Sequence, residues 1–272
     1  MSTIDELMNR KSVRAFTGEP IPAEHKALIL AAATQAPSAG CQQLYTIINV
    51  TDQTIKDQLV DTCDHQPFIA KADLVLIFLA DLRKWYEGYR DVDAQPREPG
   101  EGDLLLAVTD AAIAAQNAVT AAWSLGIGSC YIGDVMENCE EQRRLLGLPK
   151  YVFPAAMVVF GYPTEQQKER PKPKRAAMEY IVAENQYPAQ TAADREEMFF
   201  KSRGLAKGAS GTVGAASEET SGDPGAAGQI SAAYREWMRA FCERKYNSDF
   251  SREMTRSVRK YLEDFKKEGD RI

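Results

Sequence analysis

One long apolar segment, from about residue 103 to residue 125, constrains the fold of this chain more than any other feature. As a helix, it carries apolar residues almost all the way round, with alanine at many positions. Its length would span a bilayer, but Asp110, Gln116 and Asn117 would then lie in mid-membrane, where polar side chains are costly. The segment therefore predicts a helix that is buried within a domain or at a subunit interface.

Short apolar and β-branched runs predict the strands of a sheet. The clearest is Leu74–Ala80, which indicates a central strand covered on both faces. The other expected strands are Leu44–Val50, Ser129–Ile132 and Ala155–Gly161. Helices are expected at Thr3–Met8, after Pro22, and at 54–62, 140–146 and 232–268. The irregular, aromatic and charged stretch 85–102 predicts a mobile lid.

The composition narrows the class of protein. A net charge of −6 over 272 residues provides no global basic field for nucleic acid, so an anionic ligand would need a local cationic pocket. The five cysteines contain no Cys-x-x-Cys pair, which indicates reduced thiols in a cytoplasm and no zinc site. Two histidines, His25 and His65, are too few for a multi-histidine metal site. The N-terminus lacks the apolar core of a targeting segment.

The stretch Arg10–Arg14 gathers three cationic side chains and one hydroxyl. In extended backbone, Arg10, Ser12 and Arg14 would point to the same face. Two guanidinium groups beside a hydroxyl suit a phosphate, because guanidinium forks bind its oxygens through paired charge-assisted hydrogen bonds. Taken alone, the stretch is better explained as a solvated turn. Three later segments change this interpretation, namely the small-residue loop 36–40, the strand exit 131–133 and the basic run 172–175.

These segments together carry a family resemblance. RKSVRAFTGEPI, APSAGCQQ, SLGIGSCYIG, FGYP and KPKR occur in an order and spacing that resemble the FMN-dependent nitroreductase and flavin reductase family, in particular its oxygen-insensitive NADPH nitroreductases. The tail AENQY at 183–187 is similar to the same subgroup. The resemblance implies an α+β fold with a mixed central sheet flanked by helices. It also implies an intertwined homodimer with two FMN sites, each built from both chains.

The resemblance assigns the cationic residues to FMN. Arg10 and Ser12, with Lys11 between them, are expected at the FMN phosphate. Arg14 would lie by flavin N1 and O2, where a cation stabilises the negative charge of reduced flavin. The basic run would complete the phosphate site from a distance, through Lys172, Lys174 or Arg175.

Further expected FMN contacts involve the ribityl chain and the ring, through Pro37, Ser38, Gln43, Gln66, Tyr131 and Ile132. The main-chain N–H of Gly133 or Asp134 would face N5, the atom that takes the hydride. The resemblance therefore implies no catalytic side chain and no metal, because hydride chemistry belongs to the flavin. The implied reductant is NADPH or NADH.

Several positions depart from the family pattern. Cys41 stands where the family often has Asn, and Asp134 stands where the subgroup tends to have Gly. The usual KPR is KPKR here, so either Lys174 or Arg175 could meet the phosphate. Arg203 matches the subgroup's basic residue for the NADPH 2′-phosphate, directly before a long Gly/Ala/Ser-rich stretch.

The resemblance implies a cytoplasmic enzyme that passes hydride from NAD(P)H through FMN to nitroaromatics, quinones or free flavin by a ping-pong mechanism. Two alternatives stay open: a reductase on the same scaffold with another acceptor (a dehalogenase, ene-reductase or flavin-modifying enzyme), and a non-catalytic FMN-binding protein. No nucleic acid or membrane partner is expected. We expect an FMN-binding domain at 1–203, a flexible insert at 204–230 and a C-terminal helical extension at 231–272 that packs on the same domain.

Overall fold

The computed structural model describes residues 2–203 and 230–266, which form two compact units. Residues 2–171 and 249–266 make the first unit, and residues 172–203 and 230–248 make the second. This grouping differs from the predicted division at residues 203 and 231. Phe199 and Phe200, before the predicted insert, pack against Tyr234 after it, so both sides belong to the same unit. The insert 204–230 lies outside the described residues except for Ile230, and the domain boundaries stay a prediction.

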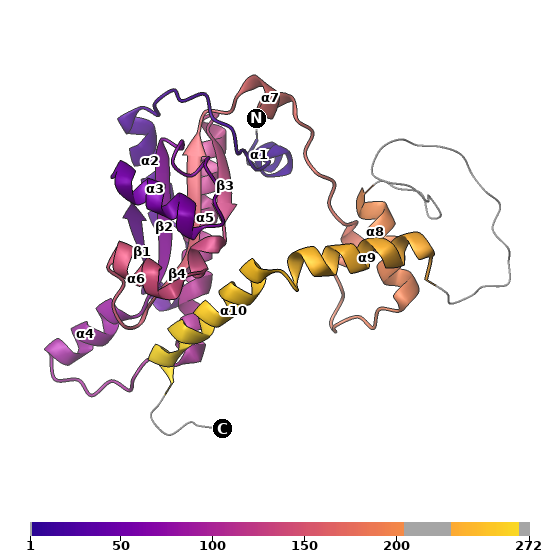
Figure 1. Cartoon of the computed structure of the whole chain (residues 1–272). Helices are drawn as coiled ribbons and strands as arrows, with labels where there is room; N and C mark the ends of the chain where they lie inside the picture. Colours follow the sequence, from indigo (N-terminus) through magenta and orange to yellow (C-terminus); the bar gives the residue numbers. More distant parts are fainter. Residues whose placement is uncertain (1, 204–229, 267–272) are drawn as a thin grey trace. The chain divides into compact units, whose positions relative to one another are not determined.

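A four-stranded sheet lies at the centre of the first unit (Figure 1). The four predicted strands are confirmed as β1 (Tyr45–Asn49), β2 (Leu74–Asp81), β3 (Gly128–Ile132) and β4 (Val152–Gly161). Their order is β1-β2-β4-β3, and every neighbouring pair is antiparallel. A mixed sheet was expected, but the four strands form an antiparallel sheet. Within the described residues, parallel pairing occurs only as an isolated bridge between Ser12 and Ser129. All eight residues of β2 are buried, as expected for a central strand.

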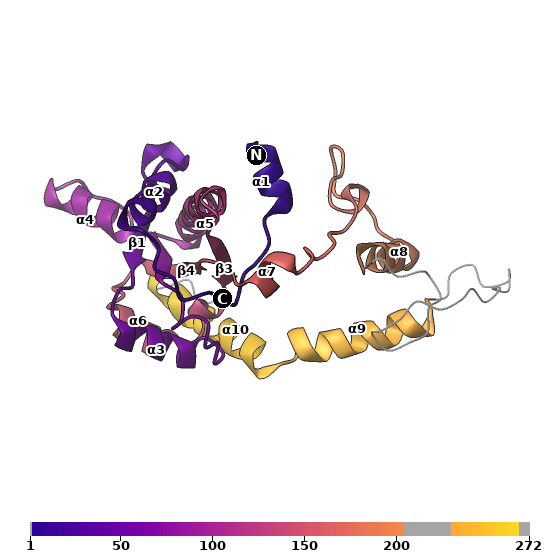
Figure 2. The ribbon, with the colours of Figure 1, turned by 90° about the horizontal axis from the view of Figure 1, so that it is seen from above.

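Helices cover both faces of this sheet (Figure 2). Because side chains alternate along a strand, Leu76 and Phe78 of β2 enter one core while Val75 and Ile77 enter the other. The first core is covered by α2 (Ala23–Thr34) and α5 (Glu101–Ser124). The second is covered by α3 (Gln53–Thr62), α6 (Cys139–Leu146) and α10 (Asp249–Leu262). The α+β class with helices on both sides of a central sheet is confirmed.

Helix α5 is the long apolar helix that the sequence predicts. In the described chain, it is the one helix that is long and apolar enough to cross a membrane by length and composition. It packs instead against α2 and the sheet, with Ala111, Ala114, Ala115 and Ala118 fully buried. Small side chains at these positions let the backbones of neighbouring elements approach closely. The helix therefore serves as a core helix of the first unit.

The N-terminal helix α1 (Thr3–Asn9) begins with a capping box, in which Ser2 and Asp5 each satisfy the other's main-chain N–H. The predicted irregular lid at 85–102 is wrong in its first part, because residues Arg83–Asp91 form helix α4. Trp85 Nε1 donates to the Gln42 carbonyl over 2.8 Å, so α4 is fastened to the loop before β1. The short elements are η1 (Ala39–Cys41), η2 (Asp134–Met136), α7 (Glu165–Glu169), η3 (Met178–Tyr180) and η4 (Glu263–Phe265).

The C-terminal chain forms two helices rather than one continuous helix. Helix α9 (Ala232–Lys245) belongs to the second unit with α8 (Ala192–Arg203), and the chain leaves helical geometry before α10 begins. Helix α10 caps the N-terminus of α6: Glu253 accepts a hydrogen bond from the Asn138 N–H (3.1 Å), and Ser257 Oγ accepts one from the Cys139 N–H (2.9 Å). These bonds satisfy main-chain donors that the first turn of a helix otherwise leaves unpaired.

Candidate functional site

The cationic stretch runs along the edge of the sheet beside β3. Ser12 forms a parallel bridge with Ser129, and the Val13 N–H donates to the Ser129 carbonyl over 2.9 Å. Val13 is only 1% exposed, whereas Ser12 is half-buried and Arg14 is exposed. The predicted alternation is therefore present, with the hydroxyl and the guanidinium on the side opposite to the buried valine.

Two glycines allow this close approach. A Cβ at Gly128 would lie 2.6 Å from Val13 Cγ2, and a Cβ at Gly161 would lie 2.7 Å from Phe16 Cδ1. Both distances are far below ordinary van der Waals contact. A side chain at either position would push the cationic stretch away from the sheet. The glycines in SLGIGSCYIG and FGYP therefore set the position of Ser12 and Arg14 from a distance in sequence.

Arg10 and Arg14 both lie close to the end of β3, where Cys130 and Tyr131 precede the strand exit. Burial raises the pKa of the Cys130 thiol, and the guanidinium groups of Arg14 and Arg10 oppose this shift. Burial likewise raises the pKa of the Tyr131 hydroxyl to about 12, and the charge of Arg10 opposes it. Among residues 2–203 and 230–266, no carboxylate forms an ion pair with Arg10 or Arg14. Their charges are available to an anionic ligand.

Lys11 has a different environment from the one predicted. Its ammonium donates to the carbonyl of Lys168 over 2.6 Å and to the carbonyl of Arg170. The Arg14 N–H donates to Gln167 Oε1 over 3.3 Å on the same helix, α7. In this structure Lys11 therefore ties the cationic stretch to the end of α7 rather than pointing to a phosphate.

The small-residue loop and the residues after it, 36–43, carry the expected FMN contacts Pro37, Ser38 and Gln43. We call this segment the flavin loop, and its own polar groups brace it. Ser38 Oγ accepts a hydrogen bond from the Gln43 N–H (3.0 Å), and Gln43 Nε2 donates to the Thr34 carbonyl (3.1 Å). Gly40, Cys41 and Gln43 all have positive φ, which indicates a tightly turned backbone. Pro37 and Ser38 are thus presented on a loop whose shape is fixed by local hydrogen bonds.

Asp110 is a site-supporting residue whose role the sequence did not reveal. Its carboxylate accepts hydrogen bonds from the Ala39 N–H (3.0 Å) and the Leu44 N–H (3.2 Å), and the residue is only 3% exposed. It therefore ties the middle of the flavin loop and the residue directly after it to α5. The sequence did contain one sign of this role, namely a charged residue within an apolar helix. A carboxylate that is buried in such a helix needs hydrogen-bond donors from neighbouring segments.

The strand exit brings Gln66 and Asp134 together. Gln66 Nε2 donates to Asp134 Oδ2 (3.0 Å) and to the Cys63 carbonyl (2.9 Å). The Asp134 carboxylate, a departure from the family pattern, is thus hydrogen-bonded within the chain. Ile132 is buried in the core and cannot pack on a ligand ring, whereas Tyr131 is 38% exposed on the other face of β3. Of these two predicted ring contacts, Tyr131 is the accessible one.

The main-chain N–H groups after β3 are open to a ligand. No acceptor within the described residues takes a hydrogen bond from the N–H of Gly133 or Asp134. Unpaired main-chain donors beside uncompensated guanidinium groups suit a flavin nucleotide, which presents a phosphate and several ring acceptors. The donors present here therefore fit FMN.

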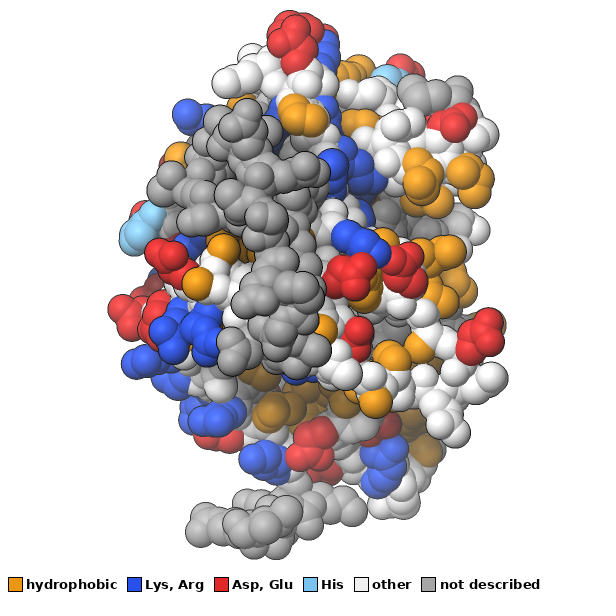
Figure 3. Space-filling model, turned by 90° about the vertical axis from the view of Figure 1, so that its right-hand side faces the viewer, with side chains coloured by type: hydrophobic (Ala, Val, Ile, Leu, Met, Phe, Trp, Pro, Cys, Tyr) orange, Lys and Arg blue, Asp and Glu red, His pale blue; other side chains and the backbone are white. Residues whose placement is uncertain are grey.

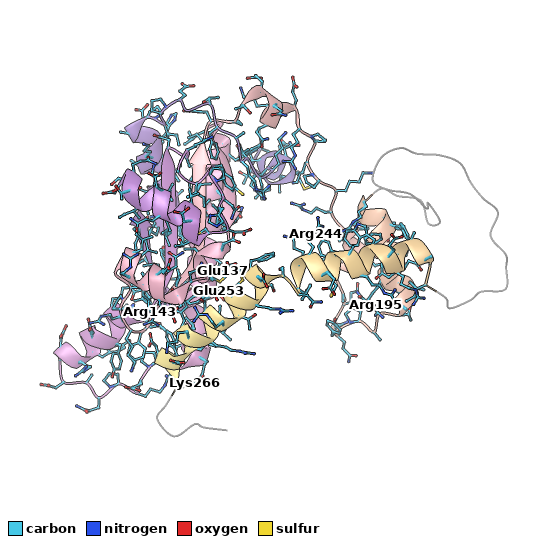
Figure 4. The ribbon with its side chains drawn as sticks, in the orientation of Figure 1. Glu137, Arg143, Arg195, Arg244, Glu253 and Lys266 are labelled. Carbon is cyan, nitrogen blue, oxygen red and sulfur yellow. The ribbon has the colours of Figure 1, made fainter. Side chains whose placement is uncertain are left out.

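Glu137, three residues beyond Asp134, is a titratable group that sequence reasoning missed. It is only 3% exposed, and its Oε1 has no hydrogen-bond partner. Burial raises the pKa of Glu137 to about 7, with further contributions from Asp134, Asp64 and Glu253. Figure 4 shows Glu137 beside Glu253 of α10. The strand exit thus rests on a buried carboxyl group that changes charge near neutral pH.

A cavity of about 300 Å³ lies elsewhere in the first unit, lined by residues of β1, β2, α4 and the chain before β4. Its charged groups are already bonded: Asp81 accepts from Thr46 Oγ1 (2.6 Å), and Lys84 Nζ donates to the Tyr45 carbonyl (2.7 Å). We do not place the functional site there, because the unpaired donors lie at the strand exit.

The remaining predicted residues belong to the second unit. Lys172, Lys174 and Arg175 lie at its start, so their contribution to the FMN phosphate stays a prediction. Arg203 ends α8 and stacks on Phe199 and Trp237 within the same unit.

Comparison with known proteins decides the family. Residues 7–162, more than half of the chain, match the model of the nitroreductase family. The chain belongs to the nitroreductase family. It is 36% identical over 185 residues to an oxygen-insensitive NADPH nitroreductase of Salmonella typhimurium, covering 68% of this chain and 74% of that protein. It is 34% identical over 179 residues to an FMN reductase [NAD(P)H] of Bacillus subtilis, covering 65% and 72%.

Solved structures support the same conclusion. This nitroreductase-family chain matches NfrA2 of B. megaterium with a TM-score of 0.73 and 26% identity, over 98% of this chain and 100% of that one. The NADPH:FMN oxidoreductase of Vibrio harveyi, solved with NAD+, matches with a TM-score of 0.65 and 28% identity, over 72% and 82%. The resemblance inferred from the motifs is therefore confirmed.

Proposed function

We propose that this nitroreductase-family protein passes reducing equivalents from NAD(P)H to nitroaromatics, quinones or free flavin by a ping-pong mechanism. Family membership and the names of the relatives confirm the coarser prediction of an NAD(P)H-dependent, FMN-using oxidoreductase. The observation that carries the proposal is the presence of two guanidinium groups without carboxylate partners next to unpaired main-chain donors at the strand exit.

The residues of the strand exit have distinct proposed roles. FMN, when bound, accepts hydride from the nicotinamide and gives it up to the acceptor. Arg10 and Ser12 would hold the phosphate, and Arg14 would stabilise negative charge on the pyrimidine side of the ring. The Gly133 or Asp134 N–H would donate to N5. Because the nicotinamide and the acceptor need the same place, each would bind in turn.

The protein's apolar surface supports a homodimer. Ile4 and Met8 of α1 are 69% and 70% exposed, and Leu105 of α5, which packs near α1, is 69% exposed. On the face drawn in Figure 3, hydrophobic side chains likewise reach the surface between charged ones. A second copy of the chain would cover these exposed apolar side chains of α1 and α5. We propose that the dimer is cytoplasmic and builds its two FMN sites from both chains.

An anaerobic absorption spectrum before and after addition of NADPH tests the activity. We expect bound flavin that bleaches within seconds and is reoxidised by a nitroaromatic or a quinone, with parallel initial-rate plots. Arg10→Gln should weaken FMN retention and Arg14→Gln should slow bleaching, whereas Arg144→Gln, at an exposed position on α6, should change neither. A purified protein that takes up no FMN would contradict the proposal. Light scattering that gives a monomer mass would contradict the dimer.

A further inference from the structure

Glu137, directly after η2, is a buried carboxyl group with an unpaired oxygen. The residue is only 3% exposed, and within the described residues no donor reaches its Oε1. A buried polar atom without a hydrogen bond costs free energy, and most such atoms in folded proteins are paired. The strand exit therefore carries an acid whose charged form the fold does not stabilise.

The backbone on both sides of Glu137 is fixed. The Glu137 N–H donates to the Asp134 carbonyl over 2.9 Å. In the next residue, the Asn138 N–H donates to Glu253 of α10 (3.1 Å), and Asn138 Nδ2 donates to the Thr62 carbonyl (2.9 Å). Glu137 is therefore held one 3-10 turn, a rise of about 6 Å, from Asp134, whose N–H is a proposed donor to flavin N5.

The groups that act on Glu137 are acidic. Burial is the main cause that raises its pKa to about 7, and the charges of Asp134 in η2, Asp64 after α3 and Glu253 in α10 raise it further. No basic side chain of the described residues opposes this shift. Figure 4 shows Glu253 beside Glu137. A carboxyl group in such surroundings responds to any further negative charge nearby.

Neighbouring elements supply no compensating charge that is free. Arg256 of α10 is bonded to Glu253 through Nε (2.9 Å) and to Glu140 of α6 through Nη2 (2.8 Å). Burial raises the pKa of the Cys63 thiol, which follows α3, to about 12, so this thiol is neutral when Glu137 titrates. Strand β4, which packs against η2, contains no titratable side chain.

We propose that Glu137 takes up a proton from solvent when bound FMN receives a hydride, and so compensates the negative charge of the reduced flavin. This inference rests on the proposed function. The hydride brings two electrons and one proton from the nicotinamide and adds one negative charge to the ring. The Glu137 carboxylate accepts one further proton and becomes neutral.

Electrostatics links the two events. In a buried site, a new negative charge within a few turns disfavours a carboxylate, because the low local dielectric screens the repulsion poorly. The coupling is reciprocal, so a protonated Glu137 makes bound FMN easier to reduce. Glu137 acts in this way through its charge and needs no contact with the ring.

Proton uptake during anaerobic reduction of the FMN-loaded protein by NADPH tests the proposal. Hydride transfer by itself neither consumes nor releases a proton. Uptake that a pH indicator reports in weakly buffered solution therefore comes from the protein. We expect roughly half a proton per flavin near pH 7.5, and almost none at pH 5.5, where Glu137 is already protonated.

Three variants assign the proton. Glu137→Gln keeps the size of the side chain but cannot titrate, so it should lose most of the uptake near pH 7.5. Glu137→Asp keeps a carboxyl group and should retain much of it. Glu141→Gln, at an exposed position on α6, is the matched control and should behave as the wild type. The midpoint potential of bound FMN should also fall less steeply with pH in Glu137→Gln than in the wild type.

The outcomes separate this inference from the proposed function. Equal uptake in the wild type and Glu137→Gln, no uptake in the wild type near pH 7.5, or equal loss in Glu141→Gln would overturn the role of Glu137. If NADPH bleaches the flavin in those cases, the proposed function stands. If NADPH does not bleach bound FMN, the proposed function fails and this inference falls with it.

Discussion

Replacing Gly128 with alanine should displace the cationic stretch from the sheet. The new Cβ would lie 2.6 Å from Val13 Cγ2 and 2.7 Å from Val13 Cβ, so the two segments would have to separate by roughly 1 Å to reach ordinary contact. Val13 cannot simply rotate away, because it is 1% exposed and its N–H is bonded to Ser129. Overpacking of this kind costs about 1–3 kcal/mol. For a chain of this size, that lowers Tm by roughly 2–12 °C.

The same displacement should also weaken the binding of FMN. Ser12 and Arg14 flank Val13, so a shift of the stretch moves both away from the positions proposed for FMN. Loss of one hydrogen bond to a charged group costs about 1.5–3 kcal/mol, which corresponds to roughly a ten- to hundred-fold weaker Kd. Tm is measured by differential scanning calorimetry of the apoprotein, and the FMN Kd by flavin fluorescence titration.

Gly102→Ala is the matched control. Gly102 lies in the first turn of α5, where an added Cβ would meet nothing within 4 Å. Alanine is favoured over glycine in helices by up to about 1 kcal/mol, so this variant should be as stable as the wild type or more stable. If Gly128→Ala and Gly102→Ala have the same Tm and the same FMN affinity, the argument that glycine sets the position of the stretch is refuted.

Three further substitutions test the supports of the site. Asp110→Asn leaves the main-chain N–H groups of Ala39 and Leu44 poorly satisfied, so it should lower the free energy of unfolding by about 1–3 kcal/mol. We expect a lower urea midpoint and weaker FMN retention. An unchanged midpoint and unchanged retention would refute the bracing role of Asp110. Glu137 has a raised folded pKa of about 7, so its ionisation destabilises the fold as pH rises toward 7 and beyond. Glu137→Gln should therefore stabilise by about 1 kcal/mol or more at pH 8 and much less at pH 4.5, and an equal Tm change at both pH values would contradict this sign. Ser257→Ala leaves the Cys139 N–H unpaired and should cost about 1–3 kcal/mol in thermal unfolding; no loss would mean that α10 does not cap α6 in solution.

Much of the first unit could be predicted from local sequence patterns. The apolar run of β2 indicated a buried central strand, and the all-round apolar character of α5 indicated a core helix. The alternation along Arg10–Arg14 placed Ser12 and Arg14 on the side opposite to Val13. These predictions succeeded because the period of side chains along a strand or helix is a local property of the backbone.

Other predictions were wrong because the features they concern depend on contacts between distant parts of the chain. Lys11 is as cationic as Arg10 in sequence, but only the structure shows that its ammonium is bonded to carbonyls at the end of α7. The lid at 85–102 begins as α4, which is fastened through Trp85 to a loop more than forty positions earlier. Ile132 was expected on the ligand, but the side-chain alternation of β3 places it in the core.

The sequence by itself determined the four strands and the long apolar helix α5, which residue types could bind a phosphate, and, through the order of its motifs, the family. The tertiary structure decided which of those residues are free to bind. Arg10 and Arg14 lack carboxylate partners in the part of the chain described, whereas Asp134 is bonded to Gln66 and Asp110 to the flavin loop. The physical reason is that a side chain's charge and hydrogen-bonding capacity follow from its residue type. Whether that capacity is already used depends on neighbours that folding brings together.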